Sequence, residues 1–395
     1  MDWFVEFITG VGRFFLHPIF YLVVILSLII GFNRVKQERR HFHIRIFDAV
    51  SEWKYAITNG LLPGLVLSLF TIGLGIVIPV GGIVLIATLT VVFSLTIRFR
   101  WLSPAFVIGL ALLFSLSLPQ WETGNHMVDT LLHDLSLIHP ASFAALLAML
   151  LATEAYLIMR NGSQLSSPRL ERSRRGRIIG VHVVNRLWMI PMFVLLPGDA
   201  VTSVFDWWPL LSIGQESYAL CLVPFSIGFY QKIKGSLPQE SIFYTGRKVM
   251  ALAVFMIVLA IVTYWMPLMG IATALLAMIG RELISIQHRV QDDDYLYFSR
   301  RGHGLVILGV IPKSPAEKMA LQVGEIITKV NGVSVASVDE FYYSLQKNRA
   351  FAKLEVIDTN GELRLVQRAL YDGEHHELGI LFVDEEKTVD REQVG

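Results

Sequence analysis

The sequence predicts an α-helical membrane domain that crosses the bilayer several times, followed by a small α+β domain. Hydrophobic residues make up 53% of the 395 residues and charged residues only 17%, whereas a soluble globular chain has about 25% charged residues. The long apolar runs end near residue 280, after which charged residues and turn signals alternate with short apolar runs. We therefore expect a polytopic domain over 1–280, a connector over 281–299, a soluble domain over 300–384 and a charged tail over 385–395.

The apolar runs of the first domain set the number of membrane spans. A spanning helix needs about 20 predominantly apolar residues, and shorter runs can tilt or pair. The candidate spans are about 15–32, 61–78, 80–97, 101–118, 141–159, 178–196, 209–230, 249–266 and 268–280. Two closely spaced pairs, turning at 79–82 and at Pro267, are each either a tight hairpin of helices or one bent helix. The sequence thus predicts six to nine spans.

Lysine and arginine residues indicate the orientation of these spans. They follow every second run, in 34–54, 98–100, 160–177 and 232–248. The stretches 119–140 and 198–208 contain neither residue. Short basic loops stay in the cytoplasm, so nine spans would place the N-terminus outside and the soluble domain in the cytoplasm. With a net charge of +1 and basic residues distributed by topology, nothing indicates a nucleic-acid partner.

Three charged residues, Glu154, Arg186 and Glu216, fall inside the apolar runs. A charge at the bilayer centre is unfavourable unless it is paired or reaches the headgroups. Arg186 and Glu216 could pair across neighbouring spans. Alternatively, Arg186 and Glu154 lie near the cytoplasmic ends and extend to the headgroups. Neither arrangement indicates a transport pathway, because interrupted helices around midplane polar groups are lacking.

Turn signals in the last hundred residues predict a module of short strands and helices. The run 304–311 is rich in β-branched residues, and 312–321 predicts a short helix. A strand over 325–330 leads into Asn331-Gly332, a strong hairpin signal.

The second half of this module continues the pattern. A helix over 338–348 begins with Ser337 and Glu340, which have the spacing of a capping box. Runs 354–358 and 362–369 predict a hairpin around another Asn-Gly turn.

The segment SPAEKMALQVGEIITKVNG, residues 314–332, resembles the PDZ domains of bacteria, and the resemblance covers about 85 residues, 300–384. Glu325 stands where the family usually has aspartate, and Met319-Ala320-Leu321 replaces the usual Ala-Gly-Leu. The ligand-receiving strand, with its Leu-Gly-Ile loop, resembles the late segment 377–383. The resemblance therefore implies a permuted PDZ domain whose binding strand is C-terminal.

Such a domain would bind a peptide by adding it as a strand beside 378–382. A terminal carboxylate would be held by backbone N–H groups of the Leu378-Gly379-Ile380 loop. The expected peptide-binding residues are Glu377, Leu378, Gly379, Ile380 and Phe382 on the strand, and Phe341, Tyr342 and Leu345 on the opposing helix. An apolar strand against an apolar helix is also what a closed core requires, so both alternatives remain at this point.

Nothing in the sequence supports catalysis. His376-Glu377 is not followed by the second histidine of a zinc protease motif, and a trypsin-like domain would not fit in the soluble part. The single cysteine, Cys221, excludes a disulfide framework. We expect a protein without metal or cofactor that is not an enzyme.

The chain as a whole resembles the MinJ family, which determines division sites in Gram-positive rods. The resemblance rests on GRFFLHPIFY at 12–21, the following basic patch, the block of spans and the PDZ segment. It implies a cell-membrane scaffold at septa and poles that links the coiled-coil scaffold DivIVA to MinD, and through MinD to the FtsZ inhibitor MinC. Other divisome membrane proteins and the lipid bilayer are further implied partners. The alternatives are a PDZ adaptor for intramembrane proteolysis or protein quality control, and a transporter with a regulatory PDZ domain.

Overall fold

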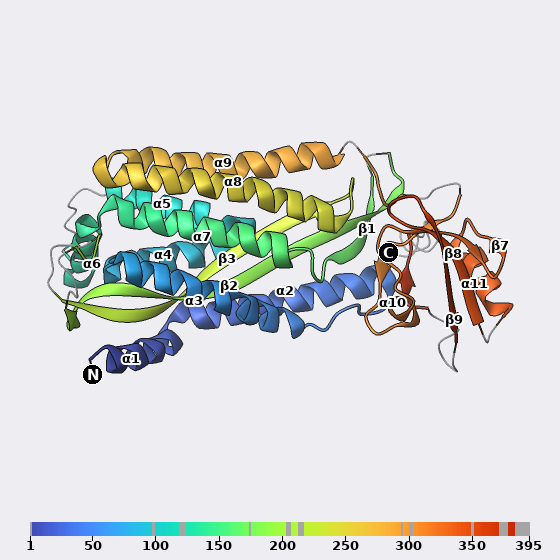
Figure 1. Ribbon diagram of the computed structural model, residues 1–395, viewed down its shortest axis with the longest axis horizontal. Coiled ribbons are helices and arrows are strands. Elements are labelled where there is room, and N and C mark those ends of the chain that lie inside the picture. Colours follow the sequence, from blue (N-terminus) through green and yellow to red (C-terminus); the bar gives the residue numbers. More distant parts are fainter. Residues whose placement is uncertain are drawn as a thin grey trace.

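The computed structural model describes residues 2–96, 99–117, 124–173, 175–202, 207–211, 217–293, 295–299, 303–348, 351–370 and 378–383. The molecule is elongated, with long helices along its main axis and a small C-terminal domain at one end (Figure 1). We call the helical part, up to residue 293, the membrane block. Its helices are α1 (Asp2–Leu16), α2 (Pro18–Phe42), α3 (Ser51–Leu74), α4 (Val80–Ser94), η1 (Phe99–Leu102), α5 (Pro104–Ser117), α6 (His126–Leu137), α7 (Pro140–Asn161), α8 (Pro238–Trp265) and α9 (Met269–Asp293).

Helices occupy seven of the nine predicted spans. Five of them, α2, α3, α7, α8 and α9, are long and apolar enough to cross a membrane, and α4 and α5 are shorter apolar helices. The fold class predicted for this part, an apolar helical block, is confirmed. The chain is a membrane protein.

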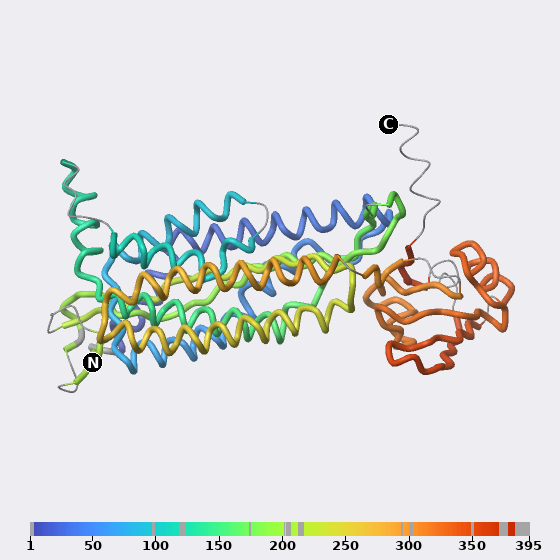
Figure 2. Tube along the Cα trace, turned by 90° about the horizontal axis from the view of Figure 1, so that it is seen from above, coloured from blue at the N-terminus to red at the C-terminus, as the bar shows by residue number. Residues whose placement is uncertain are grey.

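The predicted helical spans 178–196 and 209–230 are wrong, because the structure has strands there. β2 (Ile178–Thr202) and β3 (Ser217–Ile233) form an antiparallel ribbon that runs along the bundle (Figures 1 and 2). Hydropathy measures the length of an apolar run and does not distinguish a buried helix from a buried strand. Pro191 and Pro224 disfavour a helix interior but do not exclude one, since α3 contains Pro63. In the ribbon the two prolines lie directly opposite each other.

Helix α3 covers the free edge of β2. A Cβ atom at Gly60 would collide with the Met189 carbonyl oxygen, so glycine allows the two backbones to meet. Further along, the Ser68 hydroxyl accepts a hydrogen bond from the Phe193 N–H at 2.9 Å, and Thr71 donates to the Phe193 carbonyl at 2.6 Å. Because unpaired backbone groups are very unfavourable inside a membrane, these contacts allow a strand to lie there.

Helix α1 covers part of the other edge of the ribbon. The Glu6 carboxylate accepts a hydrogen bond from the Leu220 N–H at 3.2 Å, and Arg13 donates to the Leu220 carbonyl at 3.1 Å. Glu6 and Arg13 also form an ion pair at 2.9 Å. One ion pair therefore satisfies both backbone groups of a β3 residue, which explains why charged residues stand in this apolar helix.

In its described residues, the C-terminal domain is built from short strands and two helices. The strands β4 and β6 to β9 form an antiparallel sheet in the order β4-β6-β8-β9, with β7 paired to β6. The elements are β4 (Leu305–Val306), β5 (Gly309–Val310), α10 (Pro315–Lys318), β6 (Ile326–Val330), β7 (Val333–Ser334), α11 (Val338–Gln346), β8 (Phe351–Ile357), β9 (Leu363–Ala369) and β10 (Ile380–Leu381). Both Asn-Gly turns join paired strands, and Ser337 and Glu340 form the predicted capping box.

Candidate peptide-binding site

The site begins at the strand that the sequence predicted to lie last in the chain and to receive the ligand. β10 pairs antiparallel with β5, with Ile380 opposite Val310. Two hydrogen bonds fix this pairing, from Leu308 N–H to the Leu381 carbonyl at 2.8 Å and from Ile311 N–H to the Gly379 carbonyl at 2.9 Å. Backbone groups alternate along a strand, so the N–H and carbonyl of Ile380 point to the opposite edge. We call this the β10 edge, and the permuted position of the strand is confirmed.

Gly379 gives the loop before β10 its shape. Its φ of +81° is a left-handed conformation that side chains rarely adopt. A Cβ atom there would also collide with the side chain of Ser314, the N-cap of α10. The loop and the start of α10 are thus packed so closely that only glycine fits between them.

The apolar side chains expected to line a groove are part of the domain core. Leu378, Phe341 and Leu345 are completely buried, Ile380 is 5% exposed and Phe382 is 6% exposed. The Phe341 and Phe382 rings lie 5.0 Å apart, which ties α11 to the strand segment. The site therefore offers a backbone edge, and Tyr342 is the partly exposed member of the expected helix wall. Glu377 lies outside the described residues.

The C-terminal domain is fixed to the membrane block through the start of β2. There, β1 (Ser167–Arg172) pairs with β2, and the C-terminal domain packs on the same segment. Leu308 is the link: its N–H bonds to β10, and its carbonyl lies 2.9 Å from Nε2 of His182. Gly180 N–H donates to the Phe298 carbonyl at 2.8 Å. One residue thus separates the β10 strand from the ribbon of the membrane block.

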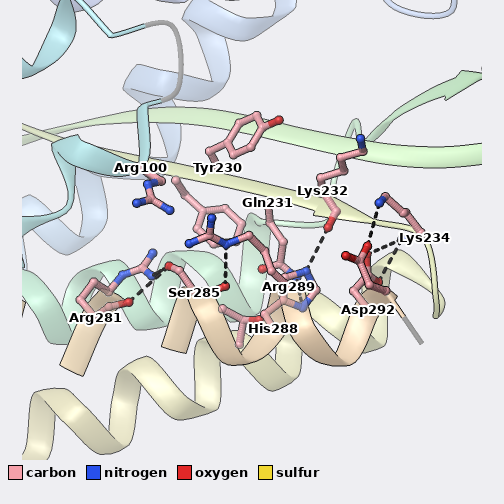
Figure 3. A pocket seen from close by; sticks show the side chains of 13 residues that line it. Arg100, Tyr230, Gln231, Lys232, Lys234, Arg281, Ser285, His288, Arg289 and Asp292 are labelled. Atoms are coloured by element: carbon pink, nitrogen blue, oxygen red, sulfur yellow. Dashed lines mark hydrogen bonds and ion pairs between the residues drawn. The ribbon is translucent and has the colours of Figure 1, made fainter. Parts of the chain in front are cut away.

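A polar pocket of about 210 Å³ anchors the helix that leads into the C-terminal domain (Figure 3). Asp292 at the end of α9 accepts hydrogen bonds from the Lys234 and Gly235 N–H groups at 2.8–3.0 Å. His288 lies 3.0 Å from the Lys232 carbonyl. These contacts hold the end of α9 on the end of β3, so the pocket helps to position the C-terminal domain. The polar side chains of the pocket are bonded to groups of the protein itself.

The charged residues predicted inside the membrane are paired, but with partners that the sequence did not indicate. Arg186 bonds to both Glu52 oxygens at 2.7 and 2.9 Å, and Arg34 pairs with the same carboxylate. Glu154 pairs with Arg281 at 2.9 Å. Arg186 is 5% exposed and Glu154 fully buried, so the expectation that they reach the headgroups is wrong. The expected partner of Arg186, Glu216, lies outside the described residues.

Several positioning residues were missed from the sequence. Glu52 and Arg281 stand at the borders of apolar runs and resembled ordinary topology signals. His182 gave a usable signal, because it is a polar residue within the run 178–196. Within the described ranges, no group of three or more histidine, cysteine, aspartate or glutamate side chains could hold a metal ion.

The geometry defines a class: a membrane protein whose helical block carries a small domain with an antiparallel sheet at its end. In agreement with this, residues 306–357 match the PDZ domain family. The chain is 41% identical over 389 residues to the cell division topological determinant MinJ of Bacillus subtilis, covering 98% of this chain and 97% of that protein. It is 26% identical over 377 residues to the probable MinJ proteins of Lacticaseibacillus paracasei and Lacticaseibacillus casei, covering 93% of this chain and 96% of each relative. The chain belongs to the MinJ family of cell division topological determinants.

Proposed function

We propose that this protein is a membrane scaffold of division-site selection that links a DivIVA-type coiled-coil scaffold to MinD, and so places the MinC–MinD inhibitor of FtsZ assembly at poles and septa. The main support is the similarity to a cell division topological determinant along the whole chain. The PDZ domain adds a means of holding another protein. The proposal includes a cytoplasmic PDZ domain and an external N-terminus, as the basic loops predict.

The β10 edge supports a specific mode of capture. A partner peptide would lie antiparallel to β10 and exchange backbone hydrogen bonds with Ile380, while the loop at Gly379 would hold its carboxylate. The predicted apolar pocket residues are in the core, so affinity would come mainly from the backbone, with Tyr342 contributing from α11.

Rigid attachment makes this domain suitable as a scaffold. The His182 to Leu308 contact and the Gly180 to Phe298 hydrogen bond fix the orientation of the PDZ domain on the block. A partner held at the β10 edge would therefore be held at a defined distance from the membrane. This arrangement needs no reacting group.

Asparagine at Gly379 tests the peptide site with a matched control. Asparagine tolerates positive φ better than other residues, so Gly379→Asn mainly adds the collision with Ser314. Gly361→Asn has a similar φ of +88° and open space around it. We expect Gly379→Asn to weaken capture of purified DivIVA or MinD at least about tenfold, as loss of the loop's hydrogen bonds would do, and Gly361→Asn to leave it unchanged.

A second variant and a localisation measurement complete the test. Tyr342→Ala changes the helix wall without entering the core, and we expect it to weaken the same capture. If neither Gly379→Asn nor Tyr342→Ala affects binding, the partner site lies elsewhere. A fluorescent fusion of the full chain should form bands at septa and poles that disappear without DivIVA, whereas uniform membrane fluorescence would contradict the division function.

A further inference from the structure

The membrane block has an apolar groove of about 940 Å³ between α3, α7 and α8. We call it the α7 groove. Small side chains of α7, including Ala145, Ala148 and Ala152, form its floor, and large side chains such as Phe70 on α3 and Ile261 on α8 form its walls. The wall residues are about half exposed, so the groove opens on the face that lipid would contact. Its lining fits a hydrocarbon chain.

The end of the groove nearest the PDZ domain carries a positive charge. Tyr156 lines the groove. Arg160, one turn further along α7, extends back over the Tyr156 ring. The Arg160 guanidinium donates to the Tyr156 hydroxyl at 2.6 Å, and its carbon lies 5.9 Å from the ring centre. Arg160 is exposed, and its guanidinium has N–H donors besides the one that bonds to Tyr156.

A polar crevice continues from this end toward the PDZ domain. The crevice measures about 740 Å³, and Arg160 lines it. Its other lining groups include Ser166 after α7, Gln239 at the start of α8, and Gln322 and Thr359 from the PDZ domain. Glu240, in the first turn of α8, lines the crevice too and is the acidic side chain among these groups. The others are uncharged, and all of them can bond to hydroxyl groups. Arg160 and Tyr156 thus join an apolar groove to a compartment suited to hydroxyl groups.

We propose that the groove and crevice together hold one anionic glycerophospholipid. An acyl chain would occupy the α7 groove, the phosphate would lie at Arg160, and a hydroxyl-bearing headgroup such as glycerol would enter the crevice. The order of apolar groove, cation and polar crevice matches the order of groups along such a lipid. A transmembrane helix of a partner protein could fill the groove too, but it would leave the polar crevice beyond Arg160 without an occupant.

This site also connects the two parts of the molecule. A headgroup in the crevice would touch both α8 and the PDZ residues Gln322 and Thr359. The bound lipid would then support the PDZ domain in the orientation set by His182 and Leu308. This inference is independent of the proposed role in cell division, since it concerns only what the membrane block binds.

Native mass spectrometry of the full chain tests the site. Purified protein is stripped of lipid and titrated with phosphatidylglycerol or with zwitterionic phosphatidylethanolamine. We expect one phosphatidylglycerol to be retained about fivefold more strongly than phosphatidylethanolamine, since one basic residue near a headgroup contributes about 1 kcal/mol. Arg160→Gln should remove this preference. Arg39→Gln, a matched change of an exposed arginine on α2, should preserve it.

Filling the groove separates a lipid from other occupants. Ala148→Phe should lower retention of both lipids, and Ala145→Leu, at a less buried floor position, should do the same if Ala148→Phe fails to fold. Equal retention of phosphatidylglycerol by Arg160→Gln and wild type would overturn the proposal. So would a photocrosslinking residue at position 145 that captures a protein helix instead of a phospholipid in cell membranes.

Discussion

Strand edges are treated in opposite ways in the two parts of this molecule. In the membrane block, α3 and α1 cover the ribbon, and hydroxyls or an ion pair bond to the backbone of Phe193 and Leu220. In the PDZ domain, the strand pairing leaves the backbone of Ile380 directed away from β5. The difference follows from the surroundings: an unpaired strand edge is very unfavourable in lipid, whereas water can satisfy one outside the membrane. A covered edge is therefore structural, and under the proposed function the β10 edge is the one that would bind a peptide.

The largest effect should come from separating α3 from the ribbon. Gly60→Val places a side chain against the Met189 carbonyl, and neither backbone can move away easily. We expect the free energy of unfolding to fall by at least about 3 kcal/mol, the upper part of the range for overpacking. Gly73→Val on the same helix meets open space and should change it by less than about 0.5 kcal/mol. Thermal unfolding in detergent compares the two, and equal losses would show that the close approach at Gly60 is unimportant.

A smaller effect is expected when the side-chain partners of the ribbon are removed but its packing is kept. Ser68→Ala together with Thr71→Val deprives the Phe193 N–H and carbonyl of their partners. An unsatisfied buried group costs about 1–3 kcal/mol, so we expect a loss of about 2–4 kcal/mol for the pair, less than full additivity would give. Thr88→Val is the control, because Thr88 bonds only within its own helix. If both variants unfold at the same temperature, the hydroxyls do not stabilise the strand edge.

The smallest effect concerns the junction between the two regions. Burial lowers the pKa of His182 to about 4, well below the 6.5 expected once it is exposed. The neutral form therefore stabilises docking at neutral pH, and this contribution is lost as the pH falls from 6.5 toward 4. Hydrogen exchange around Phe298 and Leu308 should increase at pH 5 relative to pH 7.5. His182→Gln, which cannot titrate, should remove this dependence, and an unchanged pH response in the variant would exclude His182 as its cause.

Local signals predicted the PDZ domain well. Ser337 and Glu340 cap α11, and the Asn-Gly turns join strands, because these features depend on neighbours in the chain. The late position of β10, paired with β5, also followed from the sequence, through the Leu378-Gly379-Ile380 loop. What the sequence left open was whether the apolar residues around it line a groove or a core. Only packing against Phe341 and Leu345 decides that.

The fold of the membrane block was harder to predict, because the contacts that determine it join residues far apart in the sequence. The runs 178–196 and 209–230 have the hydropathy of spanning helices, and only their pairing with each other and with α3 makes them strands. The partner of Arg186 lies 134 residues away, and the partner of Glu154 lies 127 residues away. A single charged residue indicates that a partner is needed but not which residue provides it.

Composition and local pattern alone determined that this chain is a membrane protein with one PDZ domain, since hydropathy, turns and caps act over a few residues. The tertiary structure decided how a β-ribbon lies in an apolar block, which charges pair with each other, and how the β10 strand is joined to that block through Leu308. Those outcomes depend on backbone groups and charges that must each find a partner once water is excluded, and any of several distant residues could have provided one.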